Sequence, residues 1–452
     1  MRAPQLFIKT ALACALAGAA VASWAQALTM DLKQVYQAAL EQDATIRASR
    51  AAADSGRERL PQARAGLLPQ ISASAGRNNN NLDTTAPNIL GTPVTTNDKY
   101  LSDNKTLQLR QPLVNIQRWL QFQQAKSVVE EVEANLDRDL QNLVVRVAGA
   151  YFEALMSDEQ LDLVLAQKKT YTALVDAAKK GLAAGSGTRT DIDDAQSRLD
   201  MAAAQELEAR QNQDLARRQL QLLVNQPVDQ IAKLNVAALR LSAPMPANLD
   251  DWTRKAEQAS PEIRAMQARL DAARREVSKA QAGHLPTLDV VAQWSNSGSE
   301  NITRVNSRYE NKTIGLQLNI PLYSGGYVNS TIRQAVAEQT RAEESLEALR
   351  RDLGVRVHKE YRGVSEGVLR VRALEQAARS AEQMMKSTQM SLTAGSRTQL
   401  DLLNAQQQFT LALRDLAQAR LVYLLSGVRL ASLVGDDAML SVEHVNGSLR
   451  VR

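Results

Sequence analysis

Two short segments of the sequence carry the side chains best suited to binding ions, because each places a carboxylate three residues after a threonine. Thr188 is followed by Asp191, and Thr398 by Asp401, in each case after a turn-forming stretch that contains glycine. A hydroxyl and a carboxylate at this spacing form a capping box, which satisfies free backbone N–H groups at the start of a helix. Capping, together with compensation of the helix dipole, is the simplest role for both aspartates.

The same aspartates could act on ions if several copies of the chain met around an axis. Each aspartate would then belong to a ring of carboxylates that repel one another, favour cations and bind divalent ions. A closed ring needs opposite charge nearby, and Arg397 is placed to reach Asp191 or Thr190 of the other segment. The alternative is an exposed arginine with no such partner.

The sequence contains no pattern typical of catalysis. His284, His358 and His444 stand far apart, and neither a Ser/His/Asp spacing nor a phosphate-binding glycine loop is present. We therefore expect no enzymatic activity, no cofactor and no metal centre.

The N-terminus predicts a secretory signal peptide over residues 1–25, with cleavage possibly after residue 27. Arg2 and Lys9 precede an apolar run at 11–21, and small residues follow it. Cleavage removes Cys14, the only cysteine, although a lipid anchor on Cys14 is an alternative. Without Arg2 and Lys9, 52 basic residues face 49 acidic ones, and the formal charge changes from +5 to +3. This balance does not indicate a nucleic-acid partner.

The remaining chain contains two repeats of one sequence pattern, which indicates a duplication. Leu68-Pro69 matches Leu285-Pro286 at an offset of 217, and Asp191 matches Asp401 at an offset of 210. We predict a first repeat at 28–227, a linker at 228–248, a second repeat at 249–435 and a C-terminal tail at 436–452. Each repeat is expected to contain a helix, a strand pair, a long helix, a tip and a further helix.

The strand pairs are predicted at 69–112 and 286–321. Apolar and polar residues alternate there, as at Ile314, Leu316 and Leu318, which is typical of half-buried strands. Polar loops at 78–104 and 296–311 should join the strands. Proline ends strand pairing, and Gly325-Gly326 suits the corner between strands and helix; the predicted corner positions are Pro69, Pro112, Pro286, Pro321, Gly325 and Gly326. The alternative is two surface hairpins of a soluble protein.

Two segments of about 65 residues, at 115–180 and 328–390, lack proline and predict helices about 100 Å long. Their apolar residues recur every three to four positions, as at Val128, Val132 and Leu136, which indicates a narrow coiled-coil seam.

After the signal peptide no apolar stretch reaches the roughly 18 residues of a membrane helix, so any crossing must use strands. Four strands cannot close a membrane barrel, because lipid leaves their edge groups unsatisfied. Two copies would give eight strands with a filled interior, whereas three give about twelve and leave a lumen. The predicted fold is a mixed α and β membrane protein, a homotrimer with a 12-stranded barrel and a long helical coiled-coil barrel.

Four segments resemble the TolC family of outer membrane factors, the trimeric export channels of Gram-negative bacteria. They are MDLKQVY at 30–36, AGHLPTLD at 282–289, PLYSGGYVNS at 321–330 and AGSRTQLD at 394–401. The resemblance implies a barrel in outer-membrane lipid and a periplasmic helical barrel. It also implies docking to a periplasmic membrane-fusion adaptor and to an inner-membrane ABC or RND transporter.

The resemblance implies a periplasmic mouth that closes like an iris. Arg397 and Asp191 match two members of the link that holds the family's mouth shut, and Asp401 matches one of its two narrowing aspartates. Leu392 replaces the tyrosine of the link and Asn404 replaces the second aspartate, so fewer links and one carboxylate ring are expected. The resemblance places adaptor docking at the tips, on Leu182, Ala184, Gly185, Ser186, Leu392, Ala394, Gly395 and Ser396.

The function expected is a passive exit duct for type I protein secretion and for efflux of small molecules. Two alternatives are a periplasmic coiled-coil protein without a pore and a channel restricted to efflux.

Overall fold

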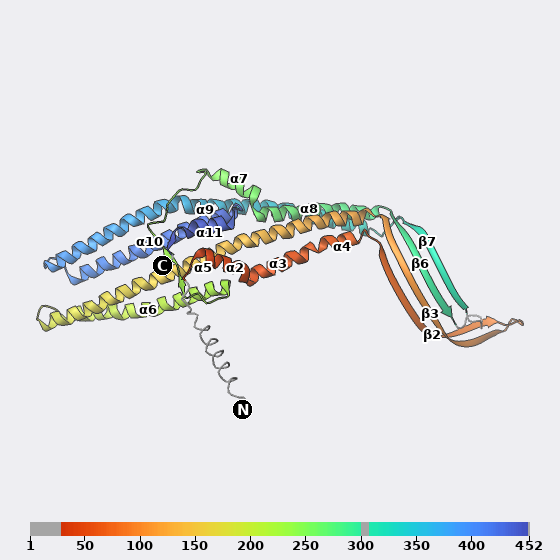
Figure 1. Cartoon of the computed structure of the whole chain (residues 1–452), viewed down its shortest axis with the longest axis horizontal. Helices are drawn as coiled ribbons and strands as arrows, with labels where there is room; N and C mark the ends of the chain where they lie inside the picture. The colour runs from red at the N-terminus through yellow and green to blue at the C-terminus, as the bar shows by residue number, and fades with distance from the viewer. Residues whose placement is uncertain (1–28, 300–306, 451–452) are drawn as a thin grey trace, which may run out of the picture. The chain divides into compact units, whose positions relative to one another are not determined.

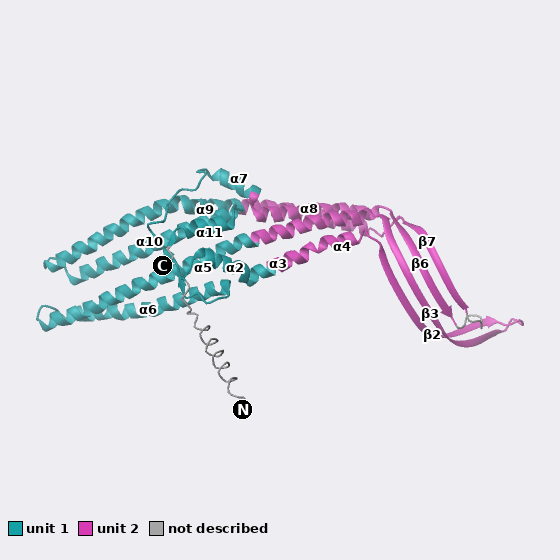
Figure 2. Ribbon diagram, in the orientation of Figure 1, with its two compact units in different colours: residues 1–48, 139–258, 353–452 teal, residues 49–138, 259–352 magenta. Residues whose placement is uncertain are grey.

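The computed structural model describes residues 29–299 and 307–450 (Figure 1). The predicted signal peptide and Cys14 lie outside these residues. The chain divides into two compact units (Figure 2): one comprises Met1–Ala48, Asp139–Gln258 and Leu353–Arg452, and the other Ser49–Arg138 and Ala259–Asp352. The two longest helices contribute to both units.

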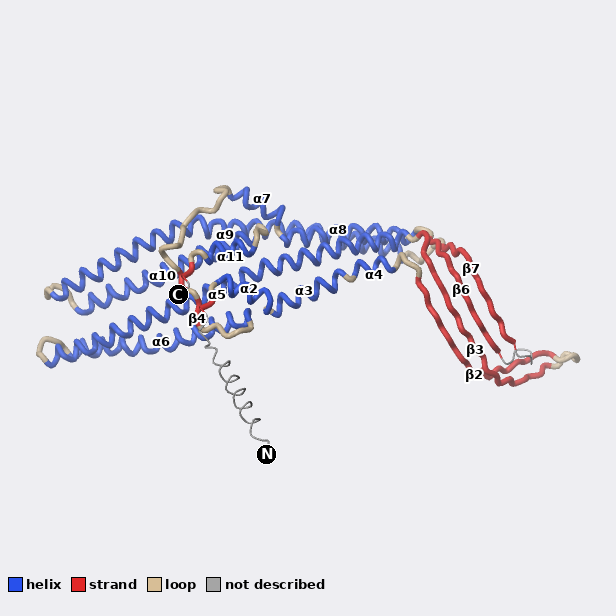
Figure 3. Tube along the Cα trace, in the orientation of Figure 1, coloured by secondary structure: helices blue, strands red, loops and turns tan. Residues whose placement is uncertain are grey.

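The second unit contains a four-stranded antiparallel sheet, shown in red in Figure 3. Its strands, in spatial order, are β2 (Gln70–Pro87), β3 (Pro93–Val114), β6 (Thr287–Ser299) and β7 (Ser307–Asn319). The register aligns apolar residues across neighbouring strands, with Ile71 opposite Leu109 and Val290 opposite Leu316. The predicted alternation is confirmed, and it gives the sheet one apolar face.

The predicted loop at 78–104 is wrong, because most of that segment is strand. β2 and β3 stay paired from Gln70 opposite Arg110 to Pro87 opposite Pro93. Polar side chains bridge the strands, with Thr85 Oγ1 2.7 Å from Thr95 Oγ1 and Asn97 Nδ2 2.8 Å from Asn81 Oδ1. In the second pair, Ser299 lies opposite Ser307, so strand also occupies both ends of the loop predicted at 296–311. Residues 300–306 lie outside the described residues.

Pro112 does not end strand pairing as predicted. It lies within β3 opposite Asp289, and the register shifts between Pro112 and Val114 before Val114 pairs with Leu288. An irregularity of this kind tolerates a residue without an N–H donor. Pro69 and Pro286 immediately precede β2 and β6, and Pro321 follows β7.

The two predicted long helices are confirmed. They are α5 (Ile116–Ala183), with 68 residues, and α9 (Tyr327–Thr393), with 67. Gly325 and Gly326, which precede α9, have φ of 62° and 84°. These left-handed values favour glycine, because a β-carbon would clash with the backbone there.

In the second unit, shorter helices pack beside α5: α3 (Ala44–Arg57, whose first residues belong to the first unit), α4 (Arg59–Ala65) and α8 (Pro261–Gln281), which is followed by the short η1 (Ala282–His284). Arg57 contacts Glu133 of α5 at 3.2 Å, and Arg264 of α8 contacts Asp137 of α5 at 2.9 Å. These contacts join both repeats within one unit.

In the first unit the chain returns after each long helix as a partner helix, α6 (Arg189–Val224) after α5 and α10 (Gln399–Leu433) after α9. Lys168 of α5 contacts Glu206 of α6 at 2.6 Å, and Arg420 of α10 contacts Glu375 of α9 at 2.8 Å. Each pair therefore forms a helical hairpin that ends in a tight turn (Figure 1).

The remaining elements of the first unit are small: β1 (Thr29–Met30), α2 (Leu32–Gln42), β4 (Gln230–Ile231), β5 (Lys233–Leu234), α7 (Leu249–Ala259), α11 (Ala438–Asn446) and β8 (Leu449–Arg450). β1 pairs with β4 and β5 pairs with β8. The predicted linker thus supplies one strand to each of two short sheets.

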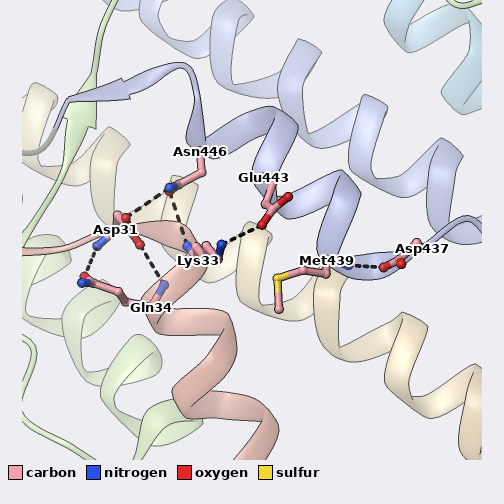
Figure 4. A network of polar contacts seen from close by, with 7 residues as sticks. All are labelled: Asp31, Lys33, Gln34, Asp437, Met439, Glu443 and Asn446. Atoms are coloured by element: carbon pink, nitrogen blue, oxygen red, sulfur yellow. Dashed lines mark hydrogen bonds and ion pairs between the residues drawn. The ribbon is translucent and has the colours of Figure 1, made fainter.

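The C-terminal tail folds back onto the beginning of the described chain (Figure 4). Asn446 Nδ2 donates to Asp31 Oδ2 at 3.1 Å, and Lys33 Nζ donates to Glu443 Oε1 at 2.6 Å. Val442 and Val445 of α11 are buried. The tail, whose place the sequence left open, therefore belongs to the first unit.

Candidate functional site

The ends of the two helical hairpins have the same turn geometry. Gly185 and Gly395 both have φ of 74°, a left-handed value at which glycine is favoured. The Gly185 N–H donates to Leu182 O at 3.0 Å, and the Gly395 N–H donates to Leu392 O at 3.0 Å. The two turns, which we call the first and second tips (181–188 and 391–398), therefore present nearly identical backbone surfaces.

A serine hydroxyl closes each tip. Ser186 Oγ donates to Gly181 O at 3.2 Å, and Ser396 Oγ donates to Ser391 O at 3.1 Å. Most of the residues expected to bind an adaptor are exposed in the described chain, and Leu392 is half-buried; the exposed ones are Leu182, Ala184, Gly185, Ser186, Ala394, Gly395 and Ser396. Adaptor docking there remains a prediction.

Both predicted capping boxes are present. Thr188 N and Oγ1 donate to Asp191 Oδ2 at 2.8 and 2.7 Å, and the Asp191 N–H donates to Thr188 Oγ1 at 3.2 Å. The second tip repeats this arrangement, with Thr398 N and Oγ1 donating to Asp401 Oδ2 at 3.0 and 2.9 Å. Each carboxylate thus fixes the start of the returning helix.

The same hydrogen bonds keep both carboxylates charged. The Thr188 hydroxyl and backbone N–H lower the pKa of Asp191, and the Thr398 backbone N–H and hydroxyl, with Arg397, lower the pKa of Asp401. A donor that faces a carboxylate stabilises its ionised form. Each aspartate can therefore cap its helix and also carry an exposed negative charge.

Arg397 lies beside its own hairpin's aspartate, with Nη1 3.8 Å from Asp401 Oδ1. Its side chain is exposed, as are Thr190, Asp191 and Asn404. The predicted link from Arg397 to Asp191 or Thr190 stays a prediction.

Sequence reasoning missed Leu403, which is 2% exposed near the second tip. It belongs to one buried apolar cluster with residues of α5 and α6, namely Tyr171, Leu174, Val175, Ala195 and Ala202. The duplication contains a signal for this position, because the offset of 210 places Asp193 of the first repeat opposite Leu403 of the second. The second hairpin therefore carries an apolar side chain that the first one lacks.

Among the described residues, no group of three or more His, Cys, Asp or Glu side chains is placed to hold a metal ion. None of the described helices is both long and apolar enough to cross a membrane.

The family model described as "Outer membrane efflux protein" matches residues 35–226 and 252–436, which together are most of the chain. The chain belongs to this family. The two matched stretches both run from the first unit through the second and back. The family comprises outer membrane efflux channels, which are not enzymes.

The protein is similar in sequence to other members. It is 34% identical to the alkaline protease secretion protein AprF of Pseudomonas aeruginosa, covering 93% of this chain and 88% of that protein. It is 30% identical to the proteases secretion protein PrtF of Dickeya chrysanthemi (91% and 90%) and 30% identical to the outer membrane protein TolC of Escherichia coli K12 (90% and 82%). These relationships confirm the TolC-like family and the outer-membrane location.

The fold matches solved outer-membrane channels. CusC superposes with a TM-score of 0.77 at 16% identity, covering 91% of this chain and 93% of CusC. VceC from Vibrio cholerae superposes with a TM-score of 0.74 at 18% identity, covering 90% and 96%. The mixed, helix-rich fold of a family of outer-membrane channels is thereby confirmed.

Proposed function

We propose that this family member is the protomer of a homotrimeric exit duct. Its strands form one third of a 12-stranded outer-membrane barrel, and its long helices form one third of a periplasmic tunnel. The duct exports proteins by type I secretion and releases small molecules delivered by efflux pumps.

The observation that carries this proposal is the two-faced sheet with open edges at β2 and β7. One face carries exposed apolar side chains, with Ile314 78% and Leu316 70% exposed. The other carries charge, with Arg110 Nε donating to Asp289 Oδ2 at 3.0 Å. In lipid, such a sheet must pair both edges and turn its charged face inward, and three copies with four strands each give about twelve strands around a lumen.

The long helices support the tunnel. At 1.5 Å per residue, the 68 residues of α5 extend about 100 Å. We infer that an early duplication produced the two halves, since helices, a strand pair, a long helix and a returning helix occur in the same order in both. Three copies would therefore arrange six related hairpins around the axis.

The exposed tips are the proposed docking sites for a periplasmic membrane-fusion adaptor, which would connect the duct to an inner-membrane ABC or RND transporter. The tips also form the proposed gate. Arg397 would link the second hairpin to Asp191 or Thr190 of the first, and Asp401 would form the carboxylate ring, with Asn404 neutral beside it. Because the two tips have similar geometry, the same adaptor surface could dock on both.

Protein secretion is included because AprF and PrtF, at 34% and 30% identity over most of the chain, are named for the secretion of proteases. Deleting the gene should stop the export of a secreted protein and increase drug susceptibility. Loss of drug resistance alone would favour the alternative of an efflux-only channel.

The decisive experiment measures the mass of the detergent-purified protein and its single-channel conductance in a planar bilayer. A trimer with a small, cation-selective conductance is expected, because the resting mouth is narrow and lined by carboxylates. A protein that needs no detergent and conducts no ions would instead be a periplasmic coiled-coil protein without a pore.

A further inference from the structure

Leu403 is buried close to the second tip, in a turn of α10 that also carries exposed residues. It lies two residues after Asp401 and is 2% exposed, whereas Leu400, in the same helical turn, is 50% exposed. Asn404, the next residue, is also exposed. Leu402 and Ala405, at 5% and 1% exposed, are buried beside it, so this turn of α10 buries apolar side chains close to the proposed gate.

The socket that buries Leu403 belongs to the other hairpin. Tyr171, Leu174 and Val175 come from α5, and Ala195 and Ala202 come from α6. Leu199 of α6 packs against the cluster from its edge. Gln167 Nε2 donates to the Tyr171 hydroxyl at 2.8 Å and helps to hold the ring in place. A side chain of α10 thus inserts between the helices of the α5–α6 hairpin.

The contact is confined to a small region. One turn further along α10, at Gln407, a groove of about 240 Å³ separates α10 from α5 and α6. Its lining mixes the apolar Leu163, Val164 and Leu411 with polar side chains such as Gln205 and Arg414. The Leu403 cluster therefore lies between this groove and the second tip.

The duplication shows that this leucine is not required to build a helical hairpin. The matching residue of the first repeat is Asp193, whose side chain is 64% exposed and lies 3.4 Å from Arg189. Leu402 matches Ile192, so the neighbouring seam position is apolar in both repeats. The position of Leu403 is therefore apolar only in the second repeat.

We propose that Leu403 is an apolar latch of the periplasmic mouth. In the closed state it occupies the socket of α5 and α6 and holds the second hairpin against the first. When the hairpins separate, Leu403 must leave the socket, and three latches act in one trimer. The inference deepens the proposed function, since it depends on a duct that is gated at the tips.

The test is the conductance of trimers that carry Leu403→Asn, a change that keeps the side chain's approximate size but not its apolar character. Burial of a leucine favours the closed state strongly enough that its loss should raise the open fraction about tenfold or more. Leu400→Asn is the matched control, and it should leave the conductance unchanged because Leu400 is half exposed. Leu403→Met should behave like the wild type.

A second variant changes the socket instead of the latch. Ala202 is 1% exposed, and Ala202→Leu should fill the socket, displace Leu403 and raise the conductance. Intact trimers of Leu403→Asn or Ala202→Leu with unchanged or lower conductance would overturn the latch. A wild-type protein without any conductance would instead overturn the proposed duct. The failure of the latch and the failure of the duct are thus distinguishable.

Discussion

At the scale of single residues, Asp401 combines a local role with a proposed collective one. Asp401→Asn should raise the concentration of divalent cations that blocks the channel by roughly tenfold, because a ring of three charges is lost. Single-channel recording with added divalent cations measures this. Thr398→Ala is the control, since it removes the hydroxyl of the same capping box but keeps the Asp401 carboxylate. Equal weakening of the block in both variants would assign the effect to capping.

The block should also depend on pH in a defined direction. Because the pKa of Asp401 is lowered from its ordinary value of 3.8, the carboxylate stays charged at that pH. The contribution of the Asp401 carboxylate to cation binding and capping is therefore fully present above pH 3.8. It is lost as the pH falls through the lowered pKa of Asp401. A titration of divalent block in the wild-type channel should show no change between pH 7 and about 4. A loss of block near pH 6 would show that another group, or repulsion within the ring, controls the block.

Arg397→Ser should increase the conductance several-fold, because the variant removes the proposed charged link between hairpins. The matched control is Arg189→Ser, which removes an exposed arginine of the first tip that lies 3.4 Å from Asp193. Both trimers are compared in planar bilayers at low and high salt, since exposed charge pairs weaken with screening. An equal change in the two variants would reduce Arg397 to a general tip charge.

The sequence predicts some residues of the candidate site and not others, for a physical reason. The capping boxes at Thr188 and Thr398 depend on residues three positions apart, so the local pattern suffices. The burial of Leu403 depends on a neighbouring hairpin more than 200 positions away in the chain, and a leucine beside Leu402 looks like an ordinary seam residue. Contacts between hairpins require the three-dimensional structure.

At the scale of elements, the sequence predicts the strands where apolar and polar residues alternate. It does not predict them where this alternation is absent. Between Asn78 and Asn97 the chain is rich in Asn and Asp, which have a low strand propensity and favour turns. Polar side chains such as Thr85 and Thr95 bond across the strands instead. A hairpin stabilised in this way has no alternation signal.

The apolar face of the sheet makes a prediction about membrane insertion. Leu316→Arg should destabilise the inserted protein by about 2 to 4 kcal/mol if the residue lies near the middle of the bilayer. Gln317→Arg changes the opposite face, where Gln317 pairs with Asp289, and should be tolerated. The yield of heat-stable trimer in the outer-membrane fraction distinguishes the two variants. Similar losses in both would contradict a lipid-facing Leu316.

At the scale of the whole molecule, the C-terminal tail is an integral part of the first unit. Deleting residues 436–452 removes the buried Val442, Val445 and Leu449, and should cost about 5 kcal/mol or more at roughly 1.5 to 3 kcal/mol for each side chain. The measurement is the midpoint of thermal unfolding. Glu443→Gln, which removes only the exposed ion pair with Lys33, should leave that midpoint nearly unchanged. A stable truncated protein would show that the tail is dispensable.

The order of the large elements could be predicted because the duplication repeats strong periodic signals. The small sheets could not, since β1, β4, β5 and β8 contain two residues each and show no period. Their partners also lie far away in the sequence, as for Lys233 opposite Arg450. Local patterns carry little information about pairings of this length and separation.

The contact between Asp31 and Asn446 links the folding of the first unit to the synthesis of α11. Asp31 is made among the first residues of the described chain, yet its partner Asn446 lies 415 positions later. Until α11 arrives, the surface of α2 that it covers stays open, and β5 has no β8 beside it. Domains fold as units while a chain is still growing, but the first unit cannot complete its fold until α11 has been made. A chain interrupted before α11 would therefore leave the α2 surface uncovered and β5 unpaired.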